Sequence, residues 1–385
     1  MVAQERVRPV QNRWSQDQLV AGIEFGPWLK ILRRHHFDVH SVYFHRAAMV
    51  TGLALPASLL GGLEQVVYGR QIEAVKLDPA PLFLLGHWRS GTTHLHNLLG
   101  RDPAHTYSNV WQAVFPNHFL LSGSLGPKLL KGALPETRSY DAVKQGWFEA
   151  AEDEIALIKL SGGLSFYGAL MFPDKFEEYE RFIDFHGATD DERDRFRAAL
   201  VLFVKKMMLA TGNKRVVVKS CAHSARIPLL LDVAPDAKFV HIHRHPARVF
   251  ASMMHMRSKV DWENFLQRPT TDFIALRQEH TARLGERLFG RLIEDRAKVP
   301  EGNLVELAYD DVCGNELPVM RALYERLGLP TWDSYEPVLK GYLDGLAGYK
   351  RNALPLDPAL VDFVYDRWRV VYDTYGYPKD PDGYL

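Results

Sequence analysis

Arg89 and three hydroxyl side chains occur together within the stretch Pro81–Arg101, where a short apolar run is followed by a helical pattern. The apolar run Leu82–Leu85 predicts a buried parallel strand, and the leucines after Thr92 recur at helical spacing. The turn between them therefore lies at a predicted helix N-terminus, where unpaired backbone N–H groups and the helix dipole favour a bound phosphate or sulfate. The turn residues expected to contact such an anion are Arg89, Ser90, Gly91, Thr92 and Thr93.

The spacing of this turn matches the nucleotide-binding P-loop, G-x-x-x-x-G-K-[ST], with one change. Gly86 and Gly91 stand at the two glycine positions, but Thr92 replaces the lysine that clamps the outer phosphates of a nucleoside triphosphate. Arg89 supplies a cation inside the loop instead, which suits a smaller anion held without a metal. The residues alone leave two alternatives open, a magnesium-dependent kinase on the same loop and an ordinary strand-to-helix turn capped by Ser or Thr.

Two segments together resemble the sulfotransferases that use 3′-phosphoadenosine 5′-phosphosulfate (PAPS). The loop GHWRSGTTHLHNLL is similar to the family's 5′-phosphosulfate loop, and Lys238–Ser252, KFVHIHRHPARVFAS, resembles its 3′-phosphate segment. The resemblance covers roughly residues 80–355. It implies that PAPS is the co-substrate and 3′-phosphoadenosine 5′-phosphate (PAP) the product, with Arg244 and Ser252 holding the 3′-phosphate.

Four more residues are candidates for PAPS contacts through the same resemblance. Lys219 ends a predicted strand, where open α/β sheets bind their ligands, and resembles the family lysine that approaches the oxygen bridging phosphate and sulfate. Tyr309 ends a later predicted strand and resembles the tyrosine near the adenine. Lys350 and Arg351 resemble the late basic segment that closes over the 3′-phosphate.

The general base is the least defined part of the predicted site. Some relatives carry a glutamate soon after the loop, but the polar residue here is Gln112, and an amide cannot accept a proton at neutral pH. The acidic cluster that precedes a helical pattern within residues 148–160 offers Glu152, which we prefer, and Glu154. His223 is a further alternative because imidazole titrates near neutral pH. The cluster could equally form a solvated first helical turn.

The composition is that of an average soluble protein. Hydrophobic residues make up 46% and charged residues 24% of the 385 residues, which indicates neither a disordered chain nor a membrane bundle. Lys plus Arg and Asp plus Glu both number 47, so no global charge favours a nucleic-acid partner. Cys221 and Cys313 are the only cysteines, which disfavours a disulfide framework, and no Cys/His spacing predicts zinc. We expect no metal and no nucleic acid.

The N-terminal region predicts a cytoplasmic chain with one unusual segment. Met1–Gln18 is polar and lacks the apolar core of a signal peptide. Ala47–Leu63 is an uncharged run of 17 residues, which we expect Pro56 and Gly61–Gly62 to interrupt. Because a spanning helix needs about 20 apolar residues, a buried or interfacial helix is the better interpretation, with peripheral membrane contact as the alternative.

Alternating strand and helix patterns predict an α/β fold with an open, mainly parallel sheet flanked by helices. The resemblance implies the P-loop NTPase-like fold of the sulfotransferases. We expect residues 1–75 to form a helical segment packed on the core, and residues 76–385 to form a single domain with a helical acceptor-binding insertion near 104–212. The predicted strands are 82–85, 215–219, 238–243 and 303–309, and the predicted helices include 189–212, 246–256, 316–327 and 357–375.

The resemblance implies an enzyme that moves a sulfuryl group from PAPS to a hydroxyl, less readily an amine, and we expect the acceptor to be a small apolar alcohol, phenol or lipid. Lys219 would stabilise the charge on the leaving oxygen, and Glu152 would take the acceptor proton. The glutamine at position 112 and the uncharged run also leave open a nucleotide-sensing or membrane-docking protein without catalysis.

Overall fold

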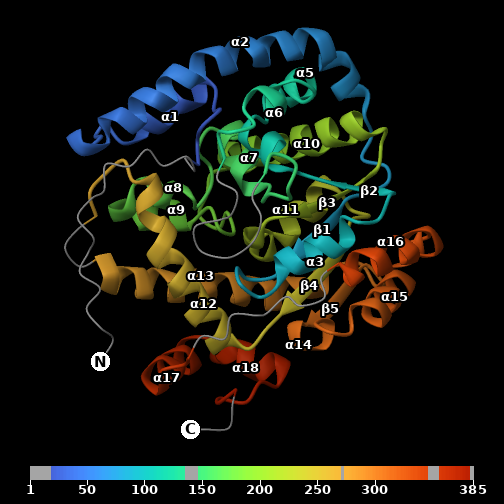
Figure 1. The fold of residues 1–385 in the computed structure, drawn as a ribbon. Helices are drawn as coiled ribbons and strands as arrows, with labels where there is room; N and C mark the ends of the chain where they lie inside the picture. Colours follow the sequence, from blue (N-terminus) through green and yellow to red (C-terminus); the bar gives the residue numbers. More distant parts are fainter. Residues whose placement is uncertain (1–18, 135–145, 270–272, 346–354, 382–385) are drawn as a thin grey trace.

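A computed structural model describes residues 19–134, 146–269, 273–345 and 355–381, and within them a five-stranded parallel sheet forms the centre of the molecule (Figure 1). Its strands are β1 (Leu82–Leu85), β2 (His105–Tyr107), β3 (Arg215–Lys219), β4 (Lys238–His243) and β5 (Leu304–Ala308). The strand order is β2-β3-β1-β4-β5, and Leu84 of β1 pairs with Lys219 on one side and Val240 on the other. The carboxyl ends of β1, β3 and β4 therefore meet at one edge of the sheet.

Helices cover both faces of the sheet because alternate side chains of each buried strand point to opposite sides. Phe83 packs in one hydrophobic cluster with Phe203 of α10 (Asp190–Thr211), and Leu84 packs in another with α3 (Thr92–Leu99). This arrangement confirms the predicted α/β fold. The longer helices that complete the two layers are α1 (Phe25–Arg34), α12 (Pro246–Val260), α13 (Phe273–Asp295), α15 (Glu316–Leu327), α16 (Trp332–Asp344) and α17 (Pro358–Arg367).

The predicted elements agree well with the structure where local signals are strong. Strands at 82–85, 215–219 and 238–243 begin and end at the predicted residues. The helix predicted over 189–212 begins with the expected capping box, in which the Thr189 hydroxyl accepts a hydrogen bond from the Glu192 backbone at 3.2 Å and Glu192 accepts one from the Thr189 backbone at 3.0 Å.

The final helix predicted over 357–375 is instead two helices, α17 and α18 (Arg369–Tyr375), separated at Trp368. The indole of Trp368 is fully buried, and its Nε1 donates a hydrogen bond to the carbonyl of Ala282 at 2.9 Å. The chain bends there because this long-range contact outweighs the continuous helical pattern.

The expectation that Pro56 and Gly61–Gly62 would interrupt the uncharged run is wrong. Helix α2 (Phe44–Ala74) contains 31 residues and continues through Pro56. Proline removes the hydrogen bond to the carbonyl of Gly52, but both residues are exposed, so water can hydrate that carbonyl. The helix spans the top of the molecule in Figure 1 and packs on α1 and α10. The domain boundary at residue 75 stays a prediction.

Candidate active site

The loop between β1 and α3 has a backbone that only specific residues tolerate. Gly86, Arg89 and Gly91 all have positive φ, at 145°, 70° and 107°. A Cβ on Gly91 would lie 2.3 Å from the ring of Tyr309, and one on Gly86 would lie 2.6 Å from the carbonyl oxygen of Ile242. The loop is therefore held tightly against β4 and Tyr309. Arg89 adopts this conformation at a cost in strain that is typical of functional loops.

Four candidate residues from separate parts of the sequence meet at this loop. The Nε of Arg89 donates a hydrogen bond to the Ser252 hydroxyl at 3.0 Å. The guanidinium of Arg244 lies 4.4 Å from the ring centre of Tyr309 and contacts the carbonyl of Arg89 at 3.4 Å. All four side chains are half-buried. Two cations and a hydroxyl thus form one cluster at the start of α3, which is suited to a phosphate or sulfate group.

The three hydroxyls of the loop differ in accessibility. Ser90 is buried and its hydroxyl donates a hydrogen bond to the carbonyl of His87 at 2.7 Å, so this side chain stabilises the turn. Thr92 is also buried, with its hydroxyl 3.6 Å from the sulfur of Cys221. Thr93 is half-buried and lies in the first turn of α3. The backbone N–H groups of this turn are the ones that a helix leaves without an internal partner.

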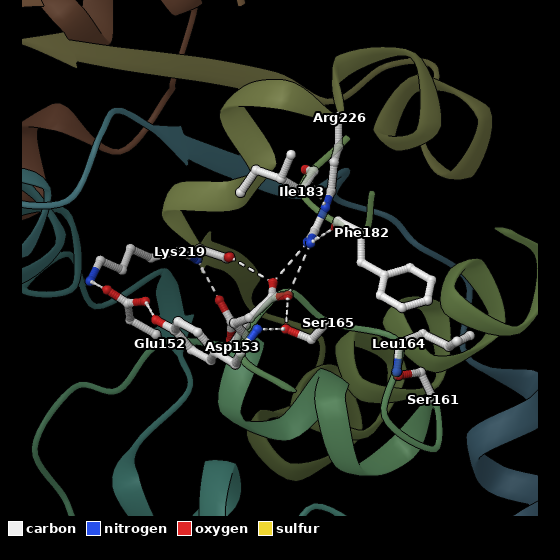
Figure 2. A network of polar contacts seen from close by, with 12 residues as sticks. Glu152, Asp153, Ser161, Leu164, Ser165, Phe182, Ile183, Lys219 and Arg226 are labelled. Carbon is white, nitrogen blue, oxygen red and sulfur yellow. Dashed lines mark hydrogen bonds and ion pairs between the residues drawn. The ribbon is translucent and has the colours of Figure 1, made fainter. Parts of the chain in front are cut away.

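Glu152 lies beside the end of β3, in contact with the lysine predicted for the site. Its carboxylate forms a 2.5 Å ion pair with the ammonium of Lys219 (Figure 2). It also accepts hydrogen bonds from the Tyr167 hydroxyl at 2.7 Å and the Trp88 indole at 3.4 Å. The Glu152 side chain is 18% exposed and that of Lys219 6%. A carboxylate fixed by three donors at the sheet edge can accept a proton from a bound hydroxyl.

The electrostatics keep this carboxylate ionised. Burial tends to raise the pKa of Glu152, but the charge and hydrogen bond of Lys219, with the hydrogen bonds from Tyr167 and Trp88, outweigh it and hold the pKa below its usual value. Burial beside this carboxylate raises the pKa of Tyr167 well above its usual value, so the phenol stays protonated and donates.

Glu154 lies in a different environment from Glu152. Both its side chain and that of Arg226 are fully buried, and their ion pair is 2.7 Å long. The Ser165 and Ser220 hydroxyls also donate to this carboxylate, at 2.6 and 2.8 Å, so both its oxygens have partners. These contacts indicate a role in the core, and we no longer favour Glu154 as a base.

The remaining residues named in the sequence analysis are His223, Gln112, Lys350 and Arg351. His223 is fully buried with its ring perpendicular to that of Phe83, and burial lowers its pKa to about 3, so these surroundings disfavour it as a base. Gln112 forms the capping box of helix α4 (Val110–Val114) with Asn109. The predictions for residues 350 and 351 lie outside the described residues.

Comparisons with known proteins identify the family. The sequence profile of the sulfotransferase family matches residues 81–334. The chain is also 33% identical over 371 residues to the omega-hydroxy-beta-dihydromenaquinone-9 sulfotransferase Stf3 of Mycobacterium bovis, which covers 96% of this chain and 94% of the relative. The chain belongs to the sulfotransferase family. The Stf3 of Mycobacterium tuberculosis matches this chain with the same identity and coverage.

Two solved structures share the fold of this sulfotransferase. STF1 from Mycobacterium tuberculosis superimposes with a TM-score of 0.61 at 20% identity, covering 89% of this chain and 90% of the other. STF9 from Mycobacterium avium gives 0.62 at 17% identity, covering 91% and 95%. Family membership confirms the predicted enzyme class. It favours a sulfotransferase loop over the loop of a magnesium-dependent kinase.

The sequence does not predict two side chains of the candidate site, Trp88 and Tyr167. Trp88 lies inside the loop, directly before Arg89, but an aromatic residue at this position is not part of a sequence motif that indicates function. Tyr167 reaches Glu152 from a segment 15 residues further along the chain and has no sequence signal. Both pack with Phe166, which lies 5.0 Å from Trp88 between ring centres. An aromatic wall therefore lies beside the Glu152 carboxylate.

Potential metal ligands also occur near α3 of the sulfotransferase. Among the described residues, His94, Cys313 and Glu316 place ligating atoms within 4.8 Å of one another. His94 and Glu316 already contact each other at 3.2 Å. The absence of a metal stays a prediction.

Asp153 gives the sulfotransferase a pH-dependent stability that can be measured. Its carboxylate accepts a hydrogen bond from the backbone N–H of Lys219. Burial raises the pKa of Asp153 from 3.8 to about 7, although hydrogen bonds from Ser108 and the Lys219 backbone act to lower it. Because the folded state then holds this proton more tightly, the stabilisation is complete below pH 3.8 and is lost as the pH rises through about 7.

We expect Asp153→Asn to remove this dependence. Between about pH 5 and 8, wild type should lose about 2 kcal/mol more unfolding free energy than the variant. Urea unfolding at both pH values measures the difference, and equal losses in the two proteins would show that Asp153 titrates normally.

Glu154→Gln tests the structural role of the buried ion pair. The change leaves the Arg226 guanidinium buried without its counter-ion, so we expect the unfolding free energy to fall by about 3 kcal/mol. The exposed pair Glu325–Arg321, 3.1 Å long, provides the control, and Glu325→Gln should cost less than about 1 kcal/mol. A Glu154→Gln protein with wild-type stability and no activity would instead place this residue in the chemistry.

Proposed function

We propose that this sulfotransferase moves a sulfuryl group from PAPS to a hydroxyl of a lipophilic acceptor and releases PAP. The observation that carries the proposal is the cluster of Arg89, Arg244 and Ser252 at the start of α3, with Glu152 and Lys219 at the neighbouring strand end. Two anion-binding arginines beside a paired base and lysine fit a nucleotide with two anionic ends.

The residues present also fit the adenine end of such a nucleotide. Tyr309 lies between Gly91 and the Arg244 guanidinium, so its ring supports both anion-binding groups. Burial, opposed by the nearby Tyr309 and Asp310, lowers the pKa of Arg244, which still remains a cation at neutral pH. An aromatic ring and a cation held together suit a base and a phosphate joined through one ribose.

In the proposed reaction, Arg89 and the first turn of α3 orient the 5′-phosphosulfate. The oxygen of the acceptor hydroxyl forms a bond to sulfur as the bond from sulfur to the bridging oxygen breaks. Glu152 receives the hydroxyl proton, and the Lys219 ammonium stabilises the negative charge on the leaving oxygen. The ion pair between Glu152 and Lys219 places the proton acceptor next to the cation before any ligand binds.

The acceptor class is supported by the aromatic wall beside Glu152. Trp88, Phe166 and Tyr167 present apolar surface there, while the Tyr167 hydroxyl orients the carboxylate. The Stf3 relative is named for a hydroxylated menaquinone, which is also lipophilic. We therefore propose a hydroxylated lipid of the quinone or polyprenyl type as the acceptor.

Thermal stabilisation by nucleotides tests the donor. PAP without metal should raise the Tm of the protein, because Arg89 and Arg244 bind its phosphates directly, whereas ATP with magnesium should have little effect. Stabilisation by ATP with magnesium but not by PAP would contradict the proposal and favour kinase chemistry on this loop.

A further inference from the structure

Helix α2 exposes large apolar side chains along its outer face. Leu55, Leu59, Leu63 and Val66 are 53%, 77%, 52% and 83% exposed. They repeat every three or four residues and so share one side of the helix. The window of mean hydropathy 1.4 within Ser41–Ala74 is only 28% buried, and by length and composition this helix could cross a membrane. We call this side the apolar face of α2.

The inner side of the helix carries the polar and small residues instead. Glu64 is 1% exposed, forms an ion pair with Lys206 of α10 and accepts a hydrogen bond from the Leu121 backbone at 3.0 Å. Gly61 approaches so closely that an added Cβ would lie 2.1 Å from the Glu24 carboxylate. A surface helix of a globular protein normally has the reverse pattern, with leucines inside and charges outside.

No exposed charge interrupts the apolar face. From Ala47 to Gly69 the only charged residue is Glu64, which is buried. At 1.5 Å per residue this stretch is about 33 Å long. The ion pair of Glu64 with Lys206 holds the inner side of α2 against α10. The helix therefore lies along the protein surface, and it would contact a membrane with its long axis parallel to the bilayer plane.

Further exposed leucines lie on the segment that follows helix α5 (Phe119–Ser122). Leu125, Leu129 and Leu130, in and beside α6 (Gly126–Leu129), are 59%, 73% and 41% exposed. Figure 1 shows α5 and α6 directly beneath α2. A cleft of about 380 Å³ opens here, with Tyr68 of α2 and the 67% exposed Phe148 in its walls.

Exposed cations accompany these leucines. Lys128 and Lys131 lie between and after them in the sequence, and Arg70 follows the apolar face on α2. Cations beside exposed leucines suit the boundary between anionic lipid headgroups and acyl chains. The whole chain has equal numbers of acidic and basic residues, so this attraction is local.

We propose that the apolar face of α2, together with the exposed leucines beside α6, docks this protein onto the surface of an anionic lipid bilayer. The helix lies in the interface with Leu59 and Val66 in the acyl region, and Lys128 and Lys131 contact the headgroups. The proposal rests on exposure and charge alone and holds whether or not the acceptor is a lipid.

Co-sedimentation with vesicles of phosphatidylcholine and phosphatidylglycerol tests this docking. Wild type should pellet with the vesicles, and the double variant Leu59→Glu/Val66→Glu should bind about tenfold or more weakly. The matched control is Val338→Glu/Val370→Glu, which alters two exposed valines elsewhere, 40% and 42% exposed, and should bind like wild type. Lys128→Glu/Lys131→Glu should weaken binding to these vesicles and leave binding to pure phosphatidylcholine unchanged.

Circular dichroism and PAP calorimetry on every variant separate docking from folding and from the proposed function. Wild type remaining in the supernatant, or equal losses in the control, would overturn the proposal. Light scattering measures the oligomeric state. If wild type is a dimer and the Leu59→Glu/Val66→Glu variant is a monomer, this face binds a second copy of the chain and the proposal is overturned. A wild-type monomer that binds vesicles through these residues supports it.

Discussion

Glu152→Gln is expected to lower kcat by about 10²- to 10⁴-fold, because the amide has the shape of the carboxylate but cannot take the acceptor proton. PAP affinity should be retained, since the glutamine still accepts the hydrogen bond that Tyr167 donates to Glu152 at 2.7 Å. Initial rates with saturating PAPS, together with PAP calorimetry, measure the two effects separately.

Glu149→Gln is the matched control for this variant. Glu149 belongs to the same acidic cluster and is exposed, so its replacement should leave kcat within a small factor of wild type. Because Lys219 and the other donors hold the pKa of Glu152 below its usual value of 4.5, the base stays ionised above that pH, and kcat/KM should show no acid limb between pH 5 and 7. A Glu152→Gln enzyme with near wild-type kcat would assign the proton transfer to another group.

The second large effect is expected at the two arginines of the loop cluster. Arg89→Ala and Arg244→Ala should each weaken PAP binding by about 10- to 100-fold, because each removes charge-assisted hydrogen bonds to a phosphate. Calorimetry with PAP measures this loss. Arg321→Ala removes an exposed arginine elsewhere and should bind PAP like wild type.

Comparison of PAP with AMP, which lacks the 3′-phosphate, separates the roles of the two arginines. Arg244→Ala should reduce the preference for PAP over AMP, whereas Arg89→Ala should weaken both nucleotides and keep the preference. An equal loss of preference in both variants would mean that the two arginines bind the same phosphate, an outcome compatible with the contact between the Arg244 guanidinium and the Arg89 carbonyl at 3.4 Å.

The central architecture could be predicted because its signals are local. The run Leu82–Leu85, the glycine-framed loop and the helix after Thr92 follow one another within the sequence, and each carries its own pattern. The segment from Lys238 to Ser252 is equally continuous. The structure adds that the loop and this segment touch, through the hydrogen bond from Arg89 to Ser252 across 163 residues.

The base and its surroundings depend on contacts that no local pattern encodes. Glu152 and Glu154 are two residues apart in one acidic cluster, but one meets Lys219 at the sheet edge and the other meets Arg226 in the core. Only the packing of this segment against β3 decides which carboxylate is accessible. Tyr167 was missed for the same reason.

Helix α2 shows a different limit of sequence reasoning. The sequence predicts an interruption at Pro56 and Gly61–Gly62, but the helix continues through these residues. Composition alone also could not tell which side of the helix faces the protein. The buried pair of Glu64 and Lys206 fixes that side, and thereby leaves the leucines outward.

The most direct test of the account is a transfer assay with sulfur-labelled PAPS and a hydroxylated polyprenyl quinone. Wild type should form labelled quinone sulfate and PAP in equal amounts, without metal, and omission of the acceptor should stop PAP release. If wild type binds PAP but forms no sulfated product with this quinone or with a panel of alcohols, phenols and amines, the proposed sulfuryl transfer is contradicted.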